Sequence, residues 1–467
     1  MNRFHTKSFF LILFLLVQNF ACAQLENKNT GWNSVGTILQ NIQPPVFPDK
    51  NFNITSFGAI GDGTTDCTDA INNTISECST NGGGKVIVPE GTFLTGAIHL
   101  KSNVNLYISE KAILEFSKDK AKYLPVVFTR WEGVECMNYS PLIYAYEQEN
   151  IAVTGKGILD GQGSNDNWWS WKGKKDYGWK DDLPNQEADR NKLFEMSDNN
   201  VPPEERVFGE GHYLRPAFFQ PYKCKNILIE GVTLKSSPMW FLNPVLCQNI
   251  SILNVTVEGL GPNNDGCDPE SCKDVLIKGC SFNTGDDCIA VKSGRNNDGR
   301  RVNVPSENII IQDCVMKDGH GGVVIGSEIS GGVKNVFAEN CKMDSPNLDR
   351  AIRIKTNAVR GGIIENIFAR NIDIGEVKEA VLKINFFYEE GEKGSFIPVV
   401  RNINLENINS QRSKYAIWIK AFDSSPVQSV TIMNCNFDNV EKENVLENVK
   451  DLKINAVTIN GKEFNLK

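Results

Sequence analysis

Four short motifs between residues 263 and 355 bring together the residue types that acid–base chemistry requires. They are, in chain order, Asn263-Asn264-Asp265-Gly266, Gly285-Asp286-Asp287-Cys288, Gly319-His320-Gly321 and Arg353-Ile354-Lys355. Neighbouring carboxylates can donate and accept protons at a reacting bond, an imidazole can return a proton to them, and paired cations can hold an anion. The motifs therefore indicate cleavage of an anionic substrate such as a chain of sugar acids.

A recurring pattern in the second half of the chain predicts the elements that position these motifs. A small polar residue, usually Asn or Asp, precedes three mostly apolar residues, and the starts lie 22 to 36 residues apart. The starting residues are Asn226, Asn249, Asp274, Asn308, Asn335, Asn366, Asn402, Ser429 and Asp451. Short runs rich in β-branched residues favour strands, and a strand repeat of this length predicts an all-β, right-handed parallel β-helix.

The first half of the chain fits the same coil. Further rungs are expected at 85–88, 105–108 and 150–153, so the β-helix domain is predicted to cover 51–467. Within 66–78, Ala70, Ile71 and Ile75 have helical spacing. A helix there is expected to cap the open end of the coil and to cover strand edges that would otherwise aggregate.

One segment, 163–211, interrupts the rhythm. It is polar and charged, it contains Trp168, Trp169, Trp171 and Trp179, and it shows neither helical nor strand periodicity. We interpret it as a long loop insertion. Its aromatic residues fit two roles, a wall across one end of a groove or a small hydrophobic core.

The inward-facing hydrophobic residues set the register of the rungs. Ile289 and Val291 match Val323 and Ile325 in the next rung, Ile352 and Ile354 in the third, and Cys267 and Pro269 in the preceding one. Because adjacent parallel strands lie about 4.8 Å apart, this register places His320 beside Asp286 and Asp265 beside Asp287.

Strand alternation decides which way the charged residues point. With Ile352 and Ile354 inward, Arg353 and Lys355 must face outward. Strict alternation would turn Asp287 into the apolar interior, where an unpaired carboxylate is very costly. Either Asp287 is neutralised or the strand has not begun there, and Gly285 favours a turn that directs Asp287 outward.

Charge and cysteine content exclude several classes. A net charge of −8 argues against nucleic-acid binding, although an acidic protein can bind a polyanion in a locally positive cleft. No CxxC or HxxxH spacing indicates a metal, and no cofactor is expected.

The chain has 13 cysteines. Cys280, Cys314, Cys341 and Cys435 recur at similar places in successive repeats, which indicates stacked, buried thiols; Cys67 with Cys78 and Cys267 with Cys272 are the candidate disulfides.

The N-terminus has the pattern of an export signal. Residues 1–23 contain a basic start, an apolar run from Phe9 to Val17 and the cleavage site Ala21-Cys22-Ala23, followed by an extension at 24–50. The mature protein is therefore expected in the periplasm or outside the cell, as a monomer. Cys22 offers lipid anchoring as an alternative, and no later stretch is long and apolar enough to span a bilayer.

In its motifs and their order, the chain resembles the polygalacturonases of glycoside hydrolase family 28, and it is similar to the bacterial exo-acting branch. The resemblance runs from about Phe52 to the C-terminus and includes Asp160-Gly161-Gln162-Gly163 and Ser237-Pro238-Met239-Trp240. Two features depart from the family pattern: Asn264 replaces the usual threonine, and about thirty residues separate the Asp pair from His320.

The resemblance implies an inverting hydrolysis of α-1,4-linked galacturonic acid without a metal. Asp286 would be the general acid, kept protonated among like charges, and His320 would tune or re-protonate it. Asp265 and Asp287 would hold and deprotonate the attacking water, at a separation from the acid of about 6.5–9.5 Å.

The resemblance also implies a pectic polysaccharide or oligogalacturonide as the substrate. The expected substrate contacts are Arg353, Lys355, Asn263, Tyr388 and, at the start of a basic stretch that could close the groove, Lys292. Removal of terminal galacturonate is favoured over internal cleavage. The alternatives are a rhamnogalacturonan or xylogalacturonan hydrolase on the same fold, a calcium-dependent pectate lyase, and a non-catalytic glycan-binding β-helix.

Overall fold

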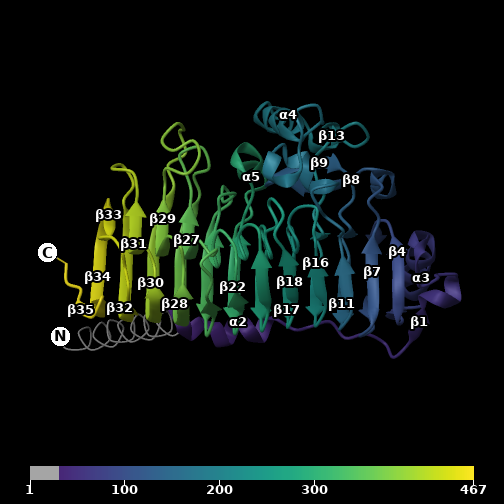
Figure 1. The fold of residues 1–467 in the computed structure, drawn as a ribbon, viewed down its shortest axis with the longest axis horizontal. Coiled ribbons are helices and arrows are strands. Elements are labelled where there is room, and N and C mark those ends of the chain that lie inside the picture. The colour runs from purple at the N-terminus through teal and green to yellow at the C-terminus, as the bar shows by residue number, and fades with distance from the viewer. Residues whose placement is uncertain (1–30, 467) are drawn as a thin grey trace, which may run out of the picture.

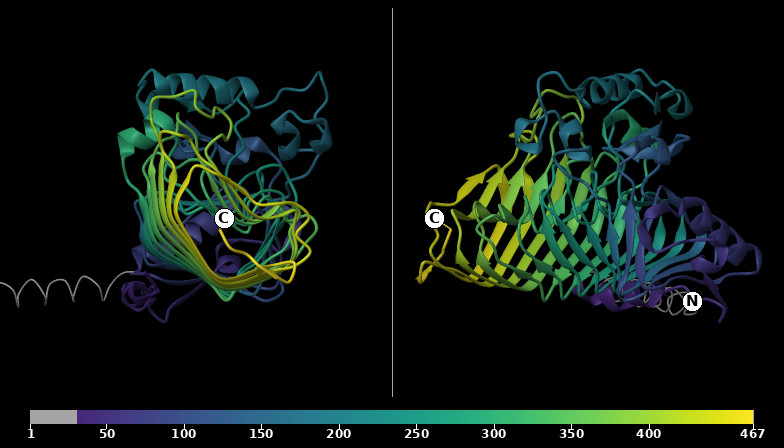
Figure 2. Two further views of the ribbon diagram at one scale, coloured as in Figure 1. Left: turned by 90° about the vertical axis from the view of Figure 1, so that its left-hand side faces the viewer. Right: turned by 45° about the vertical axis from the view of Figure 1, so that its right-hand side comes forward.

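The chain winds into a single right-handed parallel β-helix, as predicted. The computed structural model describes residues 31–466, so the expected signal at 1–23 and the first part of the extension lie outside the described residues. Figure 1 shows successive turns side by side along the long axis, from blue N-terminal turns to yellow C-terminal ones, and the left view of Figure 2 looks along the coil.

Three ladders of hydrogen-bonded parallel strands form the wall of the coil. The first ladder contains the strands that the repeat predicted, and it is continuous from end to end. Its strands are β1 (Asn51–Asn53), β3 (Gly84–Val88), β6 (Val104–Ile108), β11 (Glu149–Gly155), β15 (Lys225–Glu230), β17 (Gln248–Leu253), β19 (Lys273–Lys278), β22 (Ser306–Gln312), β25 (Val333–Glu339), β28 (Ile363–Glu376), β30 (Val399–Arg412), β32 (Val427–Phe437) and β34 (Val449–Ile459).

The second ladder follows the first after a bend and merges with it in the long C-terminal strands. Its own strands are β2 (Asp62–Asp66), β4 (Gly91–Thr95), β7 (Ala112–Phe116), β12 (Ile158–Asp160), β16 (Thr233–Lys235), β18 (Thr256–Gly259), β20 (Ser281–Thr284), β23 (Val315–Met316) and β26 (Lys342–Met343). The short strand β35 (Lys462–Glu463) folds back antiparallel on β34 at the C-terminal end.

The third ladder positions the acid–base motifs. Its strands are β5 (Ile98–His99), β10 (Ile143–Tyr146), β14 (Phe219–Tyr222), β21 (Ile289–Val291), β24 (Val323–Ile325), β27 (Arg350–Lys355), β29 (Ala380–Asn385), β31 (Tyr415–Lys420) and β33 (Val445–Glu447). Between β14 and β21 the ladder continues through single bridges at Leu242 and Cys267.

Aligned aliphatic side chains fill the coil because parallel register stacks equivalent residues directly over one another. One such column of buried residues is Ile227, Ile250, Val275, Ile309, Val336, Ile367, Ile403 and Val430. Burial of these columns supplies the main driving force for winding the coil.

The polar residue that starts each repeat forms a bend with a left-handed backbone. Asn308, Asn335 and Asn366 have φ values of 60°, 59° and 62°, a conformation that asparagine tolerates better than most residues. Their side chains also bond from rung to rung: Asn335 Nδ2 donates to Asn308 Oδ1 at 3.0 Å, and Asn366 Nδ2 donates to Asn335 Oδ1 at 2.9 Å. The repeated asparagines therefore form a ladder of hydrogen-bonded side-chain amides along the coil.

The predicted capping helix is present as α3 (Thr68–Thr80), with Ile71 and Ile75 fully buried against the first rungs. A second helix, α2 (Val35–Asn41), follows the 3₁₀ turn η1 (Gly31–Ser34) and lies against the outside of the coil, where it packs on Phe337 and Phe368. No helix within 31–466 has the length and apolar character needed to cross a bilayer.

The segment 163–211, which we interpreted as a long loop insertion, is partly helical. It contains α4 (Glu187–Asp198) and the 3₁₀ turns η4 (Trp168–Lys172), η5 (Lys175–Tyr177) and η6 (Pro203–Glu205). The helix lacks an apolar stripe because Leu193 is its one buried apolar side chain, so periodicity could not reveal it. Trp168 and Trp171 are buried and pack edge to face, which confirms the small-core interpretation for these two residues.

This insertion rises above the coil together with the antiparallel hairpin of β8 (Val127–Trp131) and β9 (Val134–Asn138), to which β13 (Val207–Phe208) adds in parallel (Figure 1). The helix α5 (Asn296–Val302) lies beside them. The remaining 3₁₀ turns are η2 (Ile54–Phe57) and η3 (Lys120–Tyr123).

The described cysteines form no disulfide. Cys67, Cys78, Cys267 and Cys272 are free and buried, so neither candidate bridge exists. The stacked-thiol interpretation is confirmed for Cys280, Cys314 and Cys341, which are buried at equivalent places in successive rungs and contact one another through sulfur. These thiols behave as small hydrophobic side chains.

Candidate active site

The predicted register of the site is correct. Ile289 pairs with Val323 and Val323 with Ile352, and Cys267 bridges to Ile289 in the rung before. Strand β21 begins only at Ile289, so Asp286 and Asp287 lie in the turn that precedes it. The sequence left two alternatives for Asp287, a neutralised carboxylate or a strand that has not yet begun, and the second holds for the backbone. Each motif therefore arrives at the same face of the coil from a different rung.

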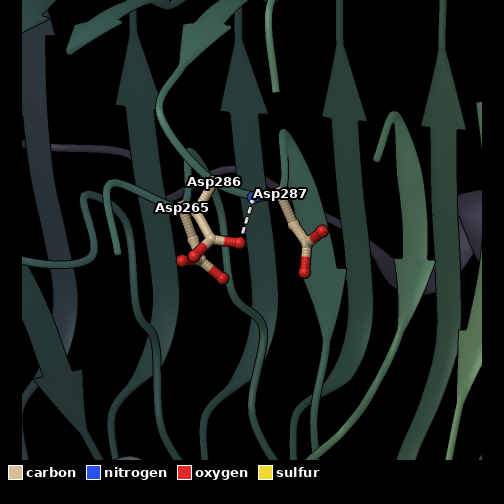
Figure 3. A group of neighbouring side chains, drawn as sticks. All are labelled: Asp265, Asp286 and Asp287. Carbon is tan, nitrogen blue, oxygen red and sulfur yellow. Dashed lines mark hydrogen bonds between the residues drawn. The ribbon is translucent and has the colours of Figure 1, made fainter. Parts of the chain in front are cut away.

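Three carboxylates meet on this face. Oxygen atoms of Asp265, Asp286 and Asp287 all lie within 4.8 Å of one another. Figure 3 shows the carboxyl groups of Asp265 and Asp286 next to each other, with that of Asp287 set apart. Asp286 and Asp287 are consecutive residues of one turn, and Asp265 comes from the preceding rung, so the three acids lie together on one face of the coil.

Asp287 does not turn outward into solvent as the glycine pattern suggested. Its side chain is completely covered, but it is neutralised: Lys355 Nζ lies 2.6 Å from Oδ2 and Arg353 Nη1 lies 3.4 Å from Oδ1. The cations that the sequence predicted on the outer face of β27 are thus the ion-pair partners of this acid. Burial of Asp287 is tolerated because two charges compensate it.

His320 contacts Asp286 as predicted. Its Nδ1 lies 2.9 Å from Asp286 Oδ1, and half of the imidazole is exposed. The same carboxylate oxygen accepts a hydrogen bond from the backbone N–H of Asp287 at 3.0 Å. The hydrogen bond from His320 to Asp286 and the negative charge of that carboxylate raise the pKa of His320.

Burial and neighbouring charges act differently on the pKa values of Asp286 and Asp265. Burial would raise the pKa of Asp286, but the hydrogen bond and charge of His320, followed by Lys355 and Lys292, hold it below its usual range. Burial, aided by Asp286, raises the pKa of Asp265 to about 8. These two acids titrate as a pair: burial favours the protonated form of Asp265, and the contact with His320 favours the ionised form of Asp286.

Lys292 lies inside the site rather than on a projecting wall. It is buried, its Nζ lies 3.3 Å from Asp265 Oδ2 and 3.3 Å from Glu328 Oε2, and it stands over the ring of Trp240 at 4.4 Å. Glu328, which the sequence did not single out, also pairs with Arg295 at 3.2 Å. Lys292 therefore connects the acid cluster to a buried ion-pair network.

Asn263 and Tyr388 both reach the cleft. Asn263 Oδ1 accepts a hydrogen bond of 2.8 Å from Arg215, a buried residue that also donates to the carbonyl oxygens of Pro238 and Pro262. The ring of Tyr388 lies 5.4 Å from Lys355 Nζ and 5.5 Å from the guanidinium of Arg353, which places an aromatic surface beside the cationic pair.

These side chains line a cleft of about 430 Å³. Of the predicted site residues, only Asp287 does not reach its surface, because Arg353 and Lys355 cover it. The residues that sequence reasoning missed are Glu132, Lys172, Lys174, Arg190, Arg295, Ser327, Glu328, Asp349, Arg350 and Glu389. Most come from loops and from the insertion, where no periodic signal links them to the site. The cleft is nevertheless rich in cations, as an acidic protein that binds a polyanion requires.

The geometry suits proton transfer to and from a substrate bound against a cationic wall. An imidazole is bonded to one acid, a second acid is buried with a raised pKa, and a third is paired with two cations. The carboxylate spacing would also admit a divalent cation, but Lys292, Arg353 and Lys355 already bring positive charge to these carboxylates. Fold and site together define a β-helix hydrolase that works by acid–base chemistry.

Comparison with known proteins agrees with this class. The model of the glycosyl hydrolases family 28 matches residues 209–458, and a model described as rhamnogalacturonase A/epimerase, pectate lyase-like, matches 51–108. The chain belongs to glycosyl hydrolase family 28, and it is therefore a glycoside hydrolase.

Individual relatives cover most of the chain. A hyperthermoactive exopolygalacturonase from Thermotoga maritima has 48% identity and a TM-score of 0.90, over 92% of this chain and 96% of that one. A probable polygalacturonase from Vitis vinifera is 29% identical over 85% of this chain and 77% of its own length. An exo-poly-alpha-D-galacturonosidase from Dickeya chrysanthemi is 28% identical over 73% of this chain and 58% of its own.

Proposed function

We propose that this enzyme is an exo-acting polygalacturonase that hydrolyses α-1,4 linkages of pectic polygalacturonate and releases galacturonate from a chain end. The main support is that the acids Asp265, Asp286 and Asp287 lie next to His320, Arg353 and Lys355 at one cleft. A pectic chain carries a carboxylate on each sugar, and the cationic wall complements that charge. The names of the Thermotoga and Dickeya relatives point to the same activity.

In the proposed mechanism, Asp286 protonates the glycosidic oxygen as the bond to the anomeric carbon breaks. His320 returns a proton to Asp286 across their 2.9 Å contact. An approaching substrate carboxylate raises the pKa of Asp286 by like-charge repulsion, which favours that transfer. Protonation of Asp286 removes a like charge that raises the pKa of Asp265, which favours the ionised form of Asp265. Water attacks the anomeric carbon while Asp265 accepts its proton, and the cycle closes when His320 regains a proton from solvent and Asp265 releases one.

Inversion is the stereochemistry that we propose. The side chains of Asp265 and Asp287 are almost completely covered, so a sugar carbon communicates with them through an intervening water rather than by direct contact. Proton NMR of the first product formed tests this step: β-galacturonate from an α linkage indicates inversion, and initial α-galacturonate contradicts it.

Action at a chain end is supported by the insertion. Lys172, Lys174 and Arg190 come from 163–211 and line the same cleft as the catalytic acids, which supports an insertion that limits the cleft on one side. A cleft closed on one side accepts a chain end and excludes an internal segment.

Product analysis on polygalacturonate is the decisive experiment. Exo action predicts that galacturonate monomer is the product from the first time point, with slow loss of viscosity, whereas early mixed oligomers would show endo action. Asp286→Asn is expected to lower the rate by about 10² to 10⁴-fold while circular dichroism stays unchanged. An Asp286→Asn variant with normal release of reducing sugar would show that the acid lies elsewhere.

The alternatives give different products. A rhamnogalacturonan or xylogalacturonan hydrolase would prefer the branched polymer in a direct comparison of kcat/KM. A pectate lyase would release unsaturated sugars that absorb in the ultraviolet and would stop after addition of a chelator. We expect no such absorbance and no effect of chelator.

We further propose that the enzyme is exported and acts as a monomer. The basic and apolar start of the chain and the Ala21-Cys22-Ala23 site support export. Cell fractionation and N-terminal sequencing of the mature protein test this proposal. A mature chain that begins at a lipid-modified Cys22 would instead show anchoring, and light scattering decides the oligomeric state.

A further inference from the structure

The cations of the cleft differ in whether a carboxylate already pairs with them. The paired ones are Arg190 with Glu132, Lys292 with Asp265 and Glu328, Arg295 with Glu328, Arg350 with Asp349, and Arg353 and Lys355 with Asp287. Lys172 and Lys174 also line the cleft, and within residues 31–466 they have no ion-pair partner. An entering anion can bind these two lysines without displacing a carboxylate of the protein.

Lys172 is held rigidly toward the cleft. It is the last residue of η4, and the following Gly173 turns the chain away with a φ of 77°. Trp168 and Trp171, both in the same turn, are buried in the small core of the insertion. A half-buried lysine on a fixed turn loses little conformational entropy on binding, so it is better preorganised than a free surface lysine.

The contacts of its turn locate Lys172 relative to the catalytic acids. Trp169 Nε1 donates to the carbonyl oxygen of Ser237 at 2.8 Å, and the carbonyl oxygen of Trp171 accepts from the backbone N–H of Gln186 at 2.8 Å. The side-chain oxygen of Gln186 in turn accepts a hydrogen bond of 3.0 Å from Arg215. Arg215 is anchored to the carbonyl oxygens of Pro238 and Pro262, in the rungs that precede Asp286. Lys172 therefore lies on the N-terminal side of the acids.

The other cationic group lies on the opposite side. Arg353 and Lys355 belong to β27, which follows β21 and β24 in the third ladder. Lys355 pairs with Asp287, and the guanidinium of Arg353 lies beside the ring of Tyr388. The catalytic acids thus separate two cationic groups, one on the insertion and one on the coil. A glycosidic bond between two uronic acids has this distribution of charge, with one carboxylate on each side.

We propose that Lys172, assisted by Lys174, binds the carboxylate of the terminal sugar that is released, while Arg353 and Lys355 bind the carboxylate of its neighbour. The inference rests on the proposed polygalacturonase function and assigns to the insertion a role in substrate selection. A terminal sugar without a free carboxylate, for example a methyl-esterified one, then fits the cleft poorly.

Digalacturonate and its two monoamides test the assignment, because each monoamide lacks the charge on one of the two sugars. Amidation of the sugar at Lys172 is expected to lower kcat/KM of the wild type by about 10- to 100-fold. Lys172→Gln should show a similar loss on unmodified digalacturonate but almost no further loss on that monoamide. The kcat/KM of Lys172→Gln should still fall on the monoamide of the other sugar. Arg353→Gln should show the opposite pattern, with almost no further loss on the monoamide of the other sugar and a further loss on the monoamide of the sugar at Lys172.

Lys180→Gln is the matched control, since Lys180 is an exposed lysine of the same insertion that does not line the cleft; its kinetics should equal those of the wild type. Lys172→Arg should recover part of the activity. If Lys172→Gln loses the same factor on all three substrates, the assignment is overturned and Lys172 acts on the acids instead. If the wild type releases no galacturonate, the proposed function fails, independently of Lys172.

Discussion

At the scale of single residues, the site buries charged side chains, and their stability depends on how completely each charge is paired. Asp287 is buried with its two cationic partners, whereas Asp265 is buried with only Lys292 near it and one carboxylate oxygen without a hydrogen-bond partner. A buried acid that is incompletely paired, such as Asp265, destabilises the folded protein, and active sites commonly contain such destabilising groups. Its effect on stability can be measured.

The first prediction concerns Asp265→Asn. Because the folded pKa of Asp265 is about 8 and its ordinary value is 3.8, the unfolded chain loses this proton at a lower pH than the folded chain. The carboxyl therefore destabilises the folded chain increasingly as pH rises from about 4 to 8, and most of this effect is present at pH 7. Asp265→Asn should raise the free energy of unfolding at pH 7 by on the order of 2 kcal/mol.

Denaturant unfolding at two pH values checks this expectation. At pH 3 Asp265 is largely protonated in both the folded and the unfolded chain, so the difference between the variant and the wild type should nearly disappear. The variant should be inactive at both pH values. A variant less stable than the wild type at pH 7 would show that the carboxylate of Asp265 is ionised and stabilising in the folded protein.

The second prediction concerns His320. Its pKa lies above the ordinary 6.5, and the proposed mechanism needs the imidazolium, so kcat/KM should fall as pH rises through that raised pKa. His320→Gln should lower kcat roughly 100-fold and remove this alkaline limb. His212, which pairs with Asp189 at 2.7 Å outside the catalytic cluster, provides the control: His212→Gln should keep the limb. An unchanged limb in His320→Gln would assign it to another group.

At the scale of elements, the bend of each rung decides how accurately the motifs align. Asn335 combines a left-handed backbone with amide bonds to Asn308 and Asn366, so it fixes the start of β25 relative to both neighbours. The residues of the third ladder lie on the same rungs, and an error in one bend would shift an acid relative to the next.

The third prediction follows from this ladder. Asn335→Ala should lower the free energy of unfolding by about 1 to 2 kcal/mol because it loses both amide contacts and strains a left-handed position. Asn335→Gly removes only the contacts and should cost less. Asn434→Ala is a second control, since Asn434 is exposed with a φ of 53° and lies outside the amide ladder. Equal effects of Asn335→Ala and Asn434→Ala would indicate that the ladder contributes nothing.

At the scale of the whole molecule, charge is distributed unevenly. The protein carries a net charge of −8, yet its cleft is lined by lysine and arginine from the coil and from the insertion. The net negative charge repels a pectic polyanion, whereas the lysine and arginine side chains of the cleft attract it. Attraction of this kind acts over about 10 Å at 0.1 M salt and is screened as the salt concentration increases.

The fourth prediction is therefore a salt effect on binding. Raising sodium chloride from low concentration to 0.5 M at constant pH should increase KM on polygalacturonate by about 3- to 10-fold. The value of kcat should change little, because the ion pairs of the acids are buried and poorly screened. Steady-state kinetics across the salt series measures both, and a constant KM with a falling kcat would contradict the argument.

The sequence alone determined the fold, the register and most of the catalytic cluster. Regular spacing of Asn–apolar repeats predicted the coil, and inward hydrophobic residues placed His320 beside Asp286 and Arg353 on the outer face. These inferences succeeded because parallel rungs have a fixed separation and strands a fixed alternation. Residue type and position then imply the neighbours directly.

Only the tertiary structure decided the path of the insertion, the pairing of Asp287 and the directions in which the pKa values of Asp265 and Asp286 shift. The helix α4 and the turn that carries Lys172 are held by contacts with distant residues and leave no period in the sequence. Whether Asp265 or Asp286 holds the proton depends on burial and on the distances to His320 and Lys292. Electrostatic energies vary with separation and solvent access, and both are properties of the folded chain.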